Sequence, residues 1–163
     1  NLAVQYAKRG FNAKVVAVDI NDDKLALAKE AGADIVINAK DTSNGAEKIQ
    51  ELTGGYHGAV VTAVSKVAFD QAVESLCAGG TVVAVGLPSE YMELSIVKTV
   101  LDGIKVVGSL VGTRKDLAEA FDFAAQGSVV PVVQKRPVED APEIFAEMEA
   151  GKINGRMVLD FIK

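Results

Sequence analysis

Residues 13–24 read AKVVAVDINDDK, an apolar run that stops on a carboxylate and passes at once into a charged segment. The valines of this run favour a β-strand over residues 13–19. Its apolar residues are adjacent rather than alternating, which is typical of a strand buried on both faces of a sheet. The charged segment favours a helix from about residue 23.

Four further runs of this kind occur along the chain. They lie at residues 34–38, 59–64, 81–86 and 104–108, and helical stretches are predicted at about 23–31, 43–53, 66–78 and 95–102. Strands that alternate with helices predict a parallel sheet, because each crossover helix covers one face of it. Right-handed crossovers make that sheet doubly wound. Glycines in EAGAD (30–34) and CAGGT (77–81) are expected where a helix ends and the next strand begins.

The two ends of the chain depart from this alternation of strands and helices. Residues 1–10 read as a helix that Gly10 ends, so we expect the sequence to start within an element of a longer protein. The last part predicts a helix at 113–127, a Pro-interrupted strand at 129–137, a helix at 139–151 and a strand at 155–162. Pro131 and Pro137 make the first of these strands an edge strand. This tail is expected to belong to a different sheet.

Composition excludes several kinds of function. The chain is 49% hydrophobic and 24% charged, which indicates a globular protein. Its net charge of −5, with no basic block, argues against binding to nucleic acid or to an anionic membrane surface. No apolar run approaches the roughly 20 residues of a membrane span, and no signal peptide opens the sequence. The single Cys77 fits the cytoplasm, and the lone His57 leaves no recognisable metal site.

Asp19 is the main candidate binding residue. In a doubly wound sheet, ligands bind beyond the carboxyl ends of the strands, and an acidic residue ending the second strand can accept hydrogen bonds from both ribose hydroxyls of an adenosine. The same charge repels a 2′-phosphate. The alternative is that Asp19 only caps the helix beginning near Asp22, although Asn21 and Asp22 are themselves capping candidates. The glycine-rich turn that would hold a pyrophosphate does not occur in the sequence, and we expect it upstream of Asn1.

Several segments carry a family resemblance, in order and over the length of the chain. They are NLAVQYAK (1–8), VVAVDINDDKLALAKEAGAD (15–34), VGLP (85–88), GSLVGTRKDLAEAFDF (108–123) and GKINGRMVLDF (151–161). Together they resemble the C-terminal half of the zinc-dependent medium-chain alcohol dehydrogenases, in particular the ethanol-active branch of bacteria and yeast. The resemblance implies a Rossmann-like domain for NAD over residues 1–110, without its first strand and glycine-rich loop. Residues 111–163 would return to the catalytic domain.

The resemblance also implies roles for individual residues. Those on the adenosine and pyrophosphate side are Asp19 and Lys24 at the ribose and Arg156 at the pyrophosphate. Those on the nicotinamide side are Val64 and Ser65 beside the cofactor, Val85, Gly86 and Leu87 along the nicotinamide, and the backbone of Ser109 and Val111 at its carboxamide. From the residues alone, the valines could equally be core residues, and Lys24 could be a solvated charge. Arg156 could be a charged residue that prevents an edge strand from pairing with another chain.

The family's zinc chemistry lies outside this sequence. In the family, the catalytic and structural zinc ligands and the groups that relay the alcohol proton come from the N-terminal half. The resemblance therefore implies that the intact enzyme transfers hydride between an alcohol and NAD, and that this chain alone is inactive.

Two alternatives come from other classes of protein. An adenosyl-methionine-dependent methyltransferase also has an acidic residue at the end of its second strand, but usually ends in an antiparallel seventh strand. A non-catalytic module that self-associates is the other alternative. Family members commonly pair through an edge of this sheet, so a homo-oligomer is expected.

Overall fold

The computed structural model describes residues 1–40 and 45–162. The chain is an α/β protein in which every strand pairing among these residues is parallel. It divides into two compact units, one formed by residues 1–40 with 117–163 and the other by residues 41–116. The predicted α/β class with parallel strands is confirmed. The five strands predicted for one sheet form two among the described residues, one of two strands and one of three.

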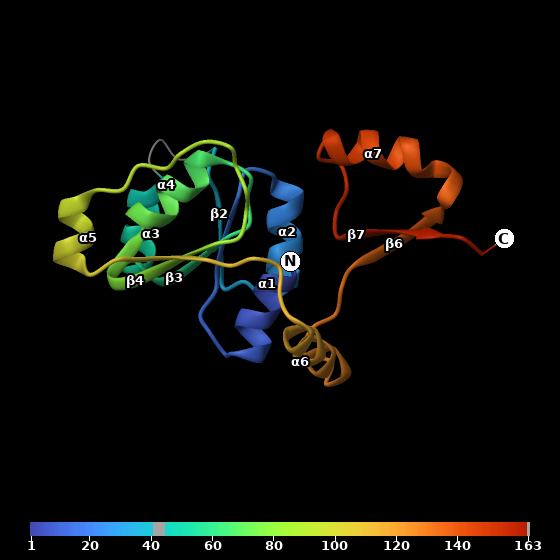
Figure 1. The fold of residues 1–163 in the computed structure, drawn as a ribbon, viewed down its shortest axis with the longest axis horizontal. Helices are drawn as coiled ribbons and strands as arrows, with labels where there is room; N and C mark the ends of the chain where they lie inside the picture. Colours follow the sequence, from blue (N-terminus) through green and yellow to red (C-terminus); the bar gives the residue numbers. More distant parts are fainter. Residues whose placement is uncertain (41–44, 163) are drawn as a thin grey trace. The chain divides into compact units, whose positions relative to one another are not determined.

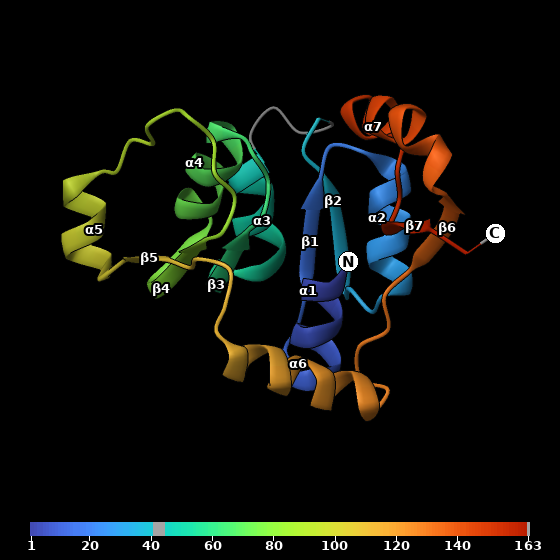
Figure 2. The same cartoon turned by 45° about the vertical axis from the view of Figure 1, so that its right-hand side comes forward.

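Two parallel strands and a helix form the centre of the first unit. Strand β1 (Val16–Asp19) pairs with β2 (Ile35–Asn38), and helix α2 (Asp22–Glu30) joins them and packs against both (Figure 2). The side chain of Asn21 caps α2, because its Oδ1 accepts hydrogen bonds from the backbone N of Asp23 at 2.9 Å and of Lys24 at 3.2 Å.

The helix predicted for residues 1–10 is present in two parts. Helix α1 (Leu2–Gln5) continues as a π-helical turn, η1 (Tyr6–Gly10). Its aromatic face meets Phe123 of helix α6 (Arg114–Ala125), since the rings of Tyr6 and Phe123 lie 5.4 Å apart in an edge-to-face arrangement. A Cβ atom on Gly10 would stand 2.9 Å from the Phe123 ring, so the glycine allows this packing.

A three-stranded sheet forms the second unit. Its strands are β3 (Tyr56–Val61), β4 (Leu76–Ala84) and β5 (Lys105–Gly108), in that order, and its helices are α3 (Gly45–Thr53), α4 (Lys66–Glu74) and α5 (Ile96–Asp102). Helix α4 packs on β3 and β4 with α3 beside it (Figure 1). The core consists of Val61, Phe69, Val73, Leu76, Val82 and Ile104.

The structure corrects the sequence prediction around residue 76. The helix predicted to reach residue 78 ends at Glu74, and β4 already starts at Leu76. Gly79 has a φ of +78° and lies within β4, where the register with β3 shifts, so it serves an irregularity of the strand rather than a helix end. Cys77 therefore lies in a strand. His57 is an exposed residue of β3. Residues 43–44 of the predicted helix 43–53 lie outside the described residues.

The C-terminal strands form a separate sheet, as predicted. Strand β6 (Val133–Pro137) pairs with β7 (Arg156–Asp160), and between them come the 3₁₀ turn η2 (Val138–Asp140) and helix α7 (Ala141–Glu149). Pro131 precedes β6 and does not interrupt it, which corrects the predicted strand 129–137. In the parts of the chain that the structure describes, no helix has the length and apolar character needed to cross a membrane.

Candidate functional site

The carboxyl ends of β3, β4 and β5 meet at one edge of the second unit, because the three strands are parallel. Seven predicted cofactor residues follow these ends, namely Val64 and Ser65 after β3, Val85, Gly86 and Leu87 after β4, and Ser109 and Val111 after β5. Backbone hydrogen bonds join the loops: Gly86 N donates to Val61 O at 2.9 Å, and Ser109 N donates to Ala84 O at 2.9 Å. The structure therefore brings these seven residues to the same edge.

This edge carries an exposed apolar surface, which we call the carboxyl-edge shelf. It consists of Val64, Val85, Leu87, Leu110 and Val111. Val64 is 74% exposed and Val111 is 97% exposed, so the interpretation of these two valines as core residues is wrong. Exposed apolar side chains gathered at the carboxyl end of a parallel sheet suit the flat face of an aromatic ligand. Leu110, which the sequence analysis did not single out, belongs to the shelf and is 84% exposed.

Val111 has an uncommon backbone conformation. Its φ is +42°, and among the described residues Asn12 is the other non-glycine residue with a positive φ. A β-branched residue in the left-handed region is an outlier, and such a conformation costs about 1–3 kcal/mol. Strain of this kind concentrates at functional sites, and it lies here on a residue predicted to touch the cofactor.

Asp19 ends β1 in the first unit, with Asn38 as its register partner at the end of β2. Its Oδ1 accepts hydrogen bonds from the backbone N of Ile20 at 2.7 Å and of Asn21 at 3.1 Å. Asn21 caps α2, so the alternative in which Asp19 is the cap is wrong. Within the described residues, Oδ2 of Asp19 accepts no hydrogen bond. Oδ1 of Asp19 thus stabilises the turn, while Oδ2 can accept hydrogen bonds from a ligand.

Arg156 and Lys24 are the other predicted site residues of the first unit. Arg156 is the exposed first residue of β7, anchored by its backbone N to Val132 O at 2.8 Å. The guanidinium therefore combines a fixed backbone with an accessible side chain. Lys24 lies exposed in the first turn of α2, close in sequence to Asp19.

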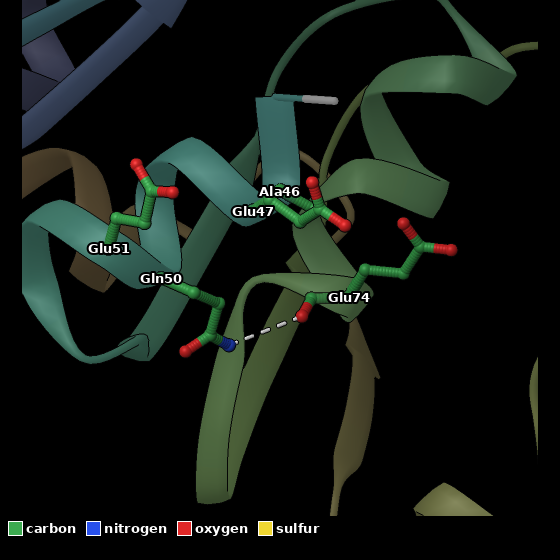
Figure 3. Close-up of a pocket in the computed structure, with 5 residues that line it drawn as sticks. All are labelled: Ala46, Glu47, Gln50, Glu51 and Glu74. Carbon is green, nitrogen blue, oxygen red and sulfur yellow. Dashed lines mark hydrogen bonds between the residues drawn. The ribbon is translucent and has the colours of Figure 1, made fainter. Parts of the chain in front are cut away.

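A hollow elsewhere in the second unit does not involve any of these residues. It has a volume of about 370 Å³ and is lined by Ala46, Glu47, Gln50, Glu51 and Glu74 (Figure 3). The amide of Gln50 donates to Glu74 O at 3.3 Å across it. Three glutamates make this hollow a poor match for an anionic dinucleotide.

The described residues do not form a metal site. Among them, no group of three or more His, Cys, Asp or Glu side chains is arranged to hold a metal ion. Their donor set therefore does not fit the zinc that the family resemblance implies.

The parallel strands, with an acidic residue ending β1 and an apolar shelf at the ends of β3 to β5, define an α/β domain of the Rossmann-like class. Residues 1–126 match the sequence profile described as zinc-binding dehydrogenase, and the chain belongs to this family. The match does not favour the methyltransferase alternative, and neither does the parallel pairing of β7 with β6.

Solved structures agree with the family. The alcohol dehydrogenase of the hyperthermophilic archaeon Aeropyrum pernix is 29% identical, with a TM-score of 0.89 over 97% of this chain and 46% of its own. An NAD-dependent alcohol dehydrogenase is 28% identical, with a TM-score of 0.86 over 98% of this chain and 47% of its own. Acetophenone reductase of Geotrichum candidum, solved with NAD, is 30% identical, with a TM-score of 0.81 over 98% and 45%. The chain thus spans less than half the length of these structures.

Proposed function

We propose that this chain is the cofactor-binding part of an NAD-dependent zinc alcohol dehydrogenase, which transfers hydride between an alcohol and NAD. The observation that carries the proposal is the Asp19 carboxylate at the carboxyl end of β1, with Oδ1 held by two backbone N–H groups and Oδ2 available. Family membership supports the reaction class. Two of the similar structures are described as NAD-dependent or as bound to NAD, which supports the cofactor.

Asp19 would bind the adenosine ribose. A carboxylate accepts hydrogen bonds from the 2′- and 3′-hydroxyls, and its negative charge repels the 2′-phosphate of NADP. The N–H groups of Ile20 and Asn21 orient the carboxylate before the ligand arrives. Lys24 would reach the same ribose from the first turn of α2. Arg156 would pair with the pyrophosphate, because a guanidinium offers both positive charge and a fork of donors.

The carboxyl-edge shelf would hold the nicotinamide half. NAD, when bound, supplies the ring carbon that accepts hydride from the alcohol. The shelf would exclude water from one face of that ring, with Val85 and Leu87 lining the nicotinamide and Val64 and Ser65 beside the cofactor. Backbone groups of Ser109 and Val111 would hold the carboxamide and so select which ring face meets the substrate. Gly86 keeps the loops after β3 and β4 together.

Zinc would belong to residues outside this sequence, so the chain alone is proposed to be inactive toward alcohols. We retain residues 1–110 as the proposed NAD-binding domain and residues 111–163 as the segment that returns to the catalytic domain. The proposed location is the cytoplasm, where a single free cysteine such as Cys77 is common.

The test is nucleotide binding by the full-length protein that contains this sequence, measured by calorimetry. Replacing Asp19 by Ala removes charge-assisted hydrogen bonds, which should weaken NADH binding by about 10-fold or more. Binding of NADPH should stay the same or improve. Asp23→Ala is the matched control, because Asp23 is exposed on the same turn. Equal losses for NADH and NADPH would remove the ribose role of Asp19, and tight binding of adenosyl-methionine would favour the methyltransferase alternative.

Self-association through the edge strand β5 is part of the proposal. All four residues of β5 are exposed, and Ile96, Val97, Val100 and Leu101 of the adjacent α5 are exposed as well. An open strand edge, together with an exposed apolar helix that packs on the neighbouring strand β4, favours a second copy of the chain. Sedimentation across a concentration series should show an oligomer that Val100→Lys weakens, and a strictly monomeric protein would contradict it.

A further inference from the structure

The loop between β5 and α6, residues 109–113, is fixed at both ends but not in its middle. At the first end, Ser109 N donates to Ala84 O at 2.9 Å, which continues the pairing of β5 with β4. In the middle, the side chains of Leu110 and Val111 are 84% and 97% exposed. Side-chain packing within the unit therefore does not hold the strained conformation of Val111.

The second end is held by a carboxylate. Oδ2 of Asp116 accepts hydrogen bonds from Thr113 N at 2.6 Å and from Thr113 Oγ1 at 2.8 Å. In return, Asp116 N donates to Thr113 Oγ1 at 3.3 Å. This is a reciprocal capping box at the start of α6. It lies two residues after Val111, and both bonds from Thr113 end on one oxygen of Asp116.

A backbone outlier persists only where its surroundings determine it. The two anchors of this loop are the β-sheet pairing of Ser109 and the capping box of Asp116, so both determine the φ of +42° at Val111. A loop that loses one anchor can relax at the strained residue first. The backbone groups of Ser109 and Val111 would then turn away from a ligand on the carboxyl-edge shelf.

We propose that Asp116 is a positioning residue for the nicotinamide half of the cofactor: through Thr113 it holds the 109–113 loop in the conformation that presents Ser109 and Val111. This inference rests on the proposed function. Asp116 does not touch the cofactor in this proposal and acts on its affinity through the loop. The competing explanation is that the capping box only stabilises helix α6.

The decisive measurement compares two ligands on the full-length protein that contains this sequence. NADH carries the nicotinamide, whereas ADP-ribose carries only the part that Asp19 and Arg156 would bind. Asp116→Ala should weaken NADH binding about fivefold, as expected for loss of a helix cap, and change ADP-ribose binding less than twofold. A purely structural role would weaken both ligands alike or neither, and either result would overturn the inference.

Two further variants separate the loop from the helix. Thr113→Val should reproduce the loss for NADH, and Thr113→Ser should restore it, because a serine hydroxyl can make both hydrogen bonds. If Asp116→Ala fails to fold, this pair carries the same comparison. Ser95→Ala is the matched control: Ser95 caps α5 by accepting from Lys98 N at 3.2 Å, and its loss should leave both ligands unaffected.

The outcomes also separate this inference from the proposed function. Wild-type protein that binds neither ligand would refute the proposed function and this inference together. Wild-type protein that binds NADH no better than ADP-ribose would overturn the inference and the proposed role of the shelf, but would leave the proposed ribose role of Asp19 intact. Selective loss of NADH affinity in Asp116→Ala and Thr113→Val would support both.

Discussion

Gly86 lies directly against the carbonyl oxygen of Ala63: a Cβ atom at position 86 would stand 2.2 Å from that oxygen and 2.9 Å from its carbon. Ala63 follows β3 and Gly86 follows β4, so this contact joins the two loops that carry Val64, Ser65, Val85 and Leu87. The chain's own packing therefore requires a glycine here. Any approach of a cofactor would be a second reason.

Gly86→Ala should destabilise the protein and loosen the carboxyl-edge shelf. The neighbouring atoms are backbone atoms, which cannot move aside cheaply, so the free energy of unfolding should fall by about 1–3 kcal/mol. Urea unfolding measures this change. Gly108→Ala is the matched control, because position 108 ends the next strand and has no atom within 4 Å of a Cβ. Equal losses for both variants would show that the contact with Ala63 is unimportant.

The buried side chain of Gln5 should contribute to stability, because its amide pairs with the backbone N–H and C=O of Val130. It is 4% exposed, its Oε1 accepts from Val130 N at 2.8 Å, and its Nε2 donates to Val130 O at 2.9 Å. Gln5→Met keeps the volume but leaves two backbone groups without partners, at about 1–3 kcal/mol for each group that stays buried. Gln134→Met is the control, because Gln134 is exposed and makes one bond of 3.3 Å to Asn154 O. Similar unfolding midpoints for both variants would contradict the prediction.

The order of strands and helices was predictable because adjacent valines and isoleucines favour strands. The predicted burial on both faces was wrong for β5, whose four residues are all exposed. The prediction failed at residues 75–78, where the short apolar run LCA (76–78) directly follows the helix end at Glu74 and its C-cap Ser75. A short apolar run fits a helix end and a buried strand equally well, and periodicity cannot separate the two. The left-handed φ of Gly79 belongs to a strand irregularity that only pairing with β3 reveals.

The candidate site was predictable to the extent that strand ends define it. The family resemblance supplied the individual residues, and parallel strands carry those that follow β3, β4 and β5 to one edge. The φ of Val111 was not predictable, since nothing in GSLVG marks a left-handed valine. The capping box had a signal, the spacing of Thr113 and Asp116 before an apolar helix. Gln5 gave no signal, because its partner is 125 residues away.

Tyr56 should make the protein sensitive to alkaline pH. Burial raises the pKa of its phenol from 10.0 to about 12, and its Oη has no hydrogen-bond partner among the described residues. Between these two pKa values the unfolded chain loses the phenol proton and the folded chain keeps it. Stability is therefore complete below pH 10 and is lost as the pH rises toward 12.

Tyr56→Phe should remove this part of the alkaline loss, and at pH 7 it should leave stability equal or slightly higher, because an unpaired buried hydroxyl is gone. Unfolding midpoints at pH 7 and across pH 10–12 measure both effects. Tyr91→Phe is the control, since Tyr91 is 93% exposed. If the two variants lose stability in parallel above pH 10, the burial of the Tyr56 phenol is not the cause.

Val111→Gly should move stability and cofactor affinity in opposite directions. Glycine adopts a positive φ without steric cost, so the variant recovers the strain of about 1–3 kcal/mol at Val111 and loses about 0.5–1 kcal/mol to the greater freedom of the unfolded chain. The side chain is 97% exposed and its removal leaves no cavity, so unfolding should require about 1 kcal/mol more in the variant. Affinity for NADH should fall, because a glycine loop samples other conformations before it binds.

Val64→Gly is the matched control, since Val64 is exposed on the same shelf but has no positive φ, and it should lose stability. A Val111→Gly protein that is destabilised as much as Val64→Gly would mean that no strain is held at position 111, and the functional argument built on that residue would fail with it.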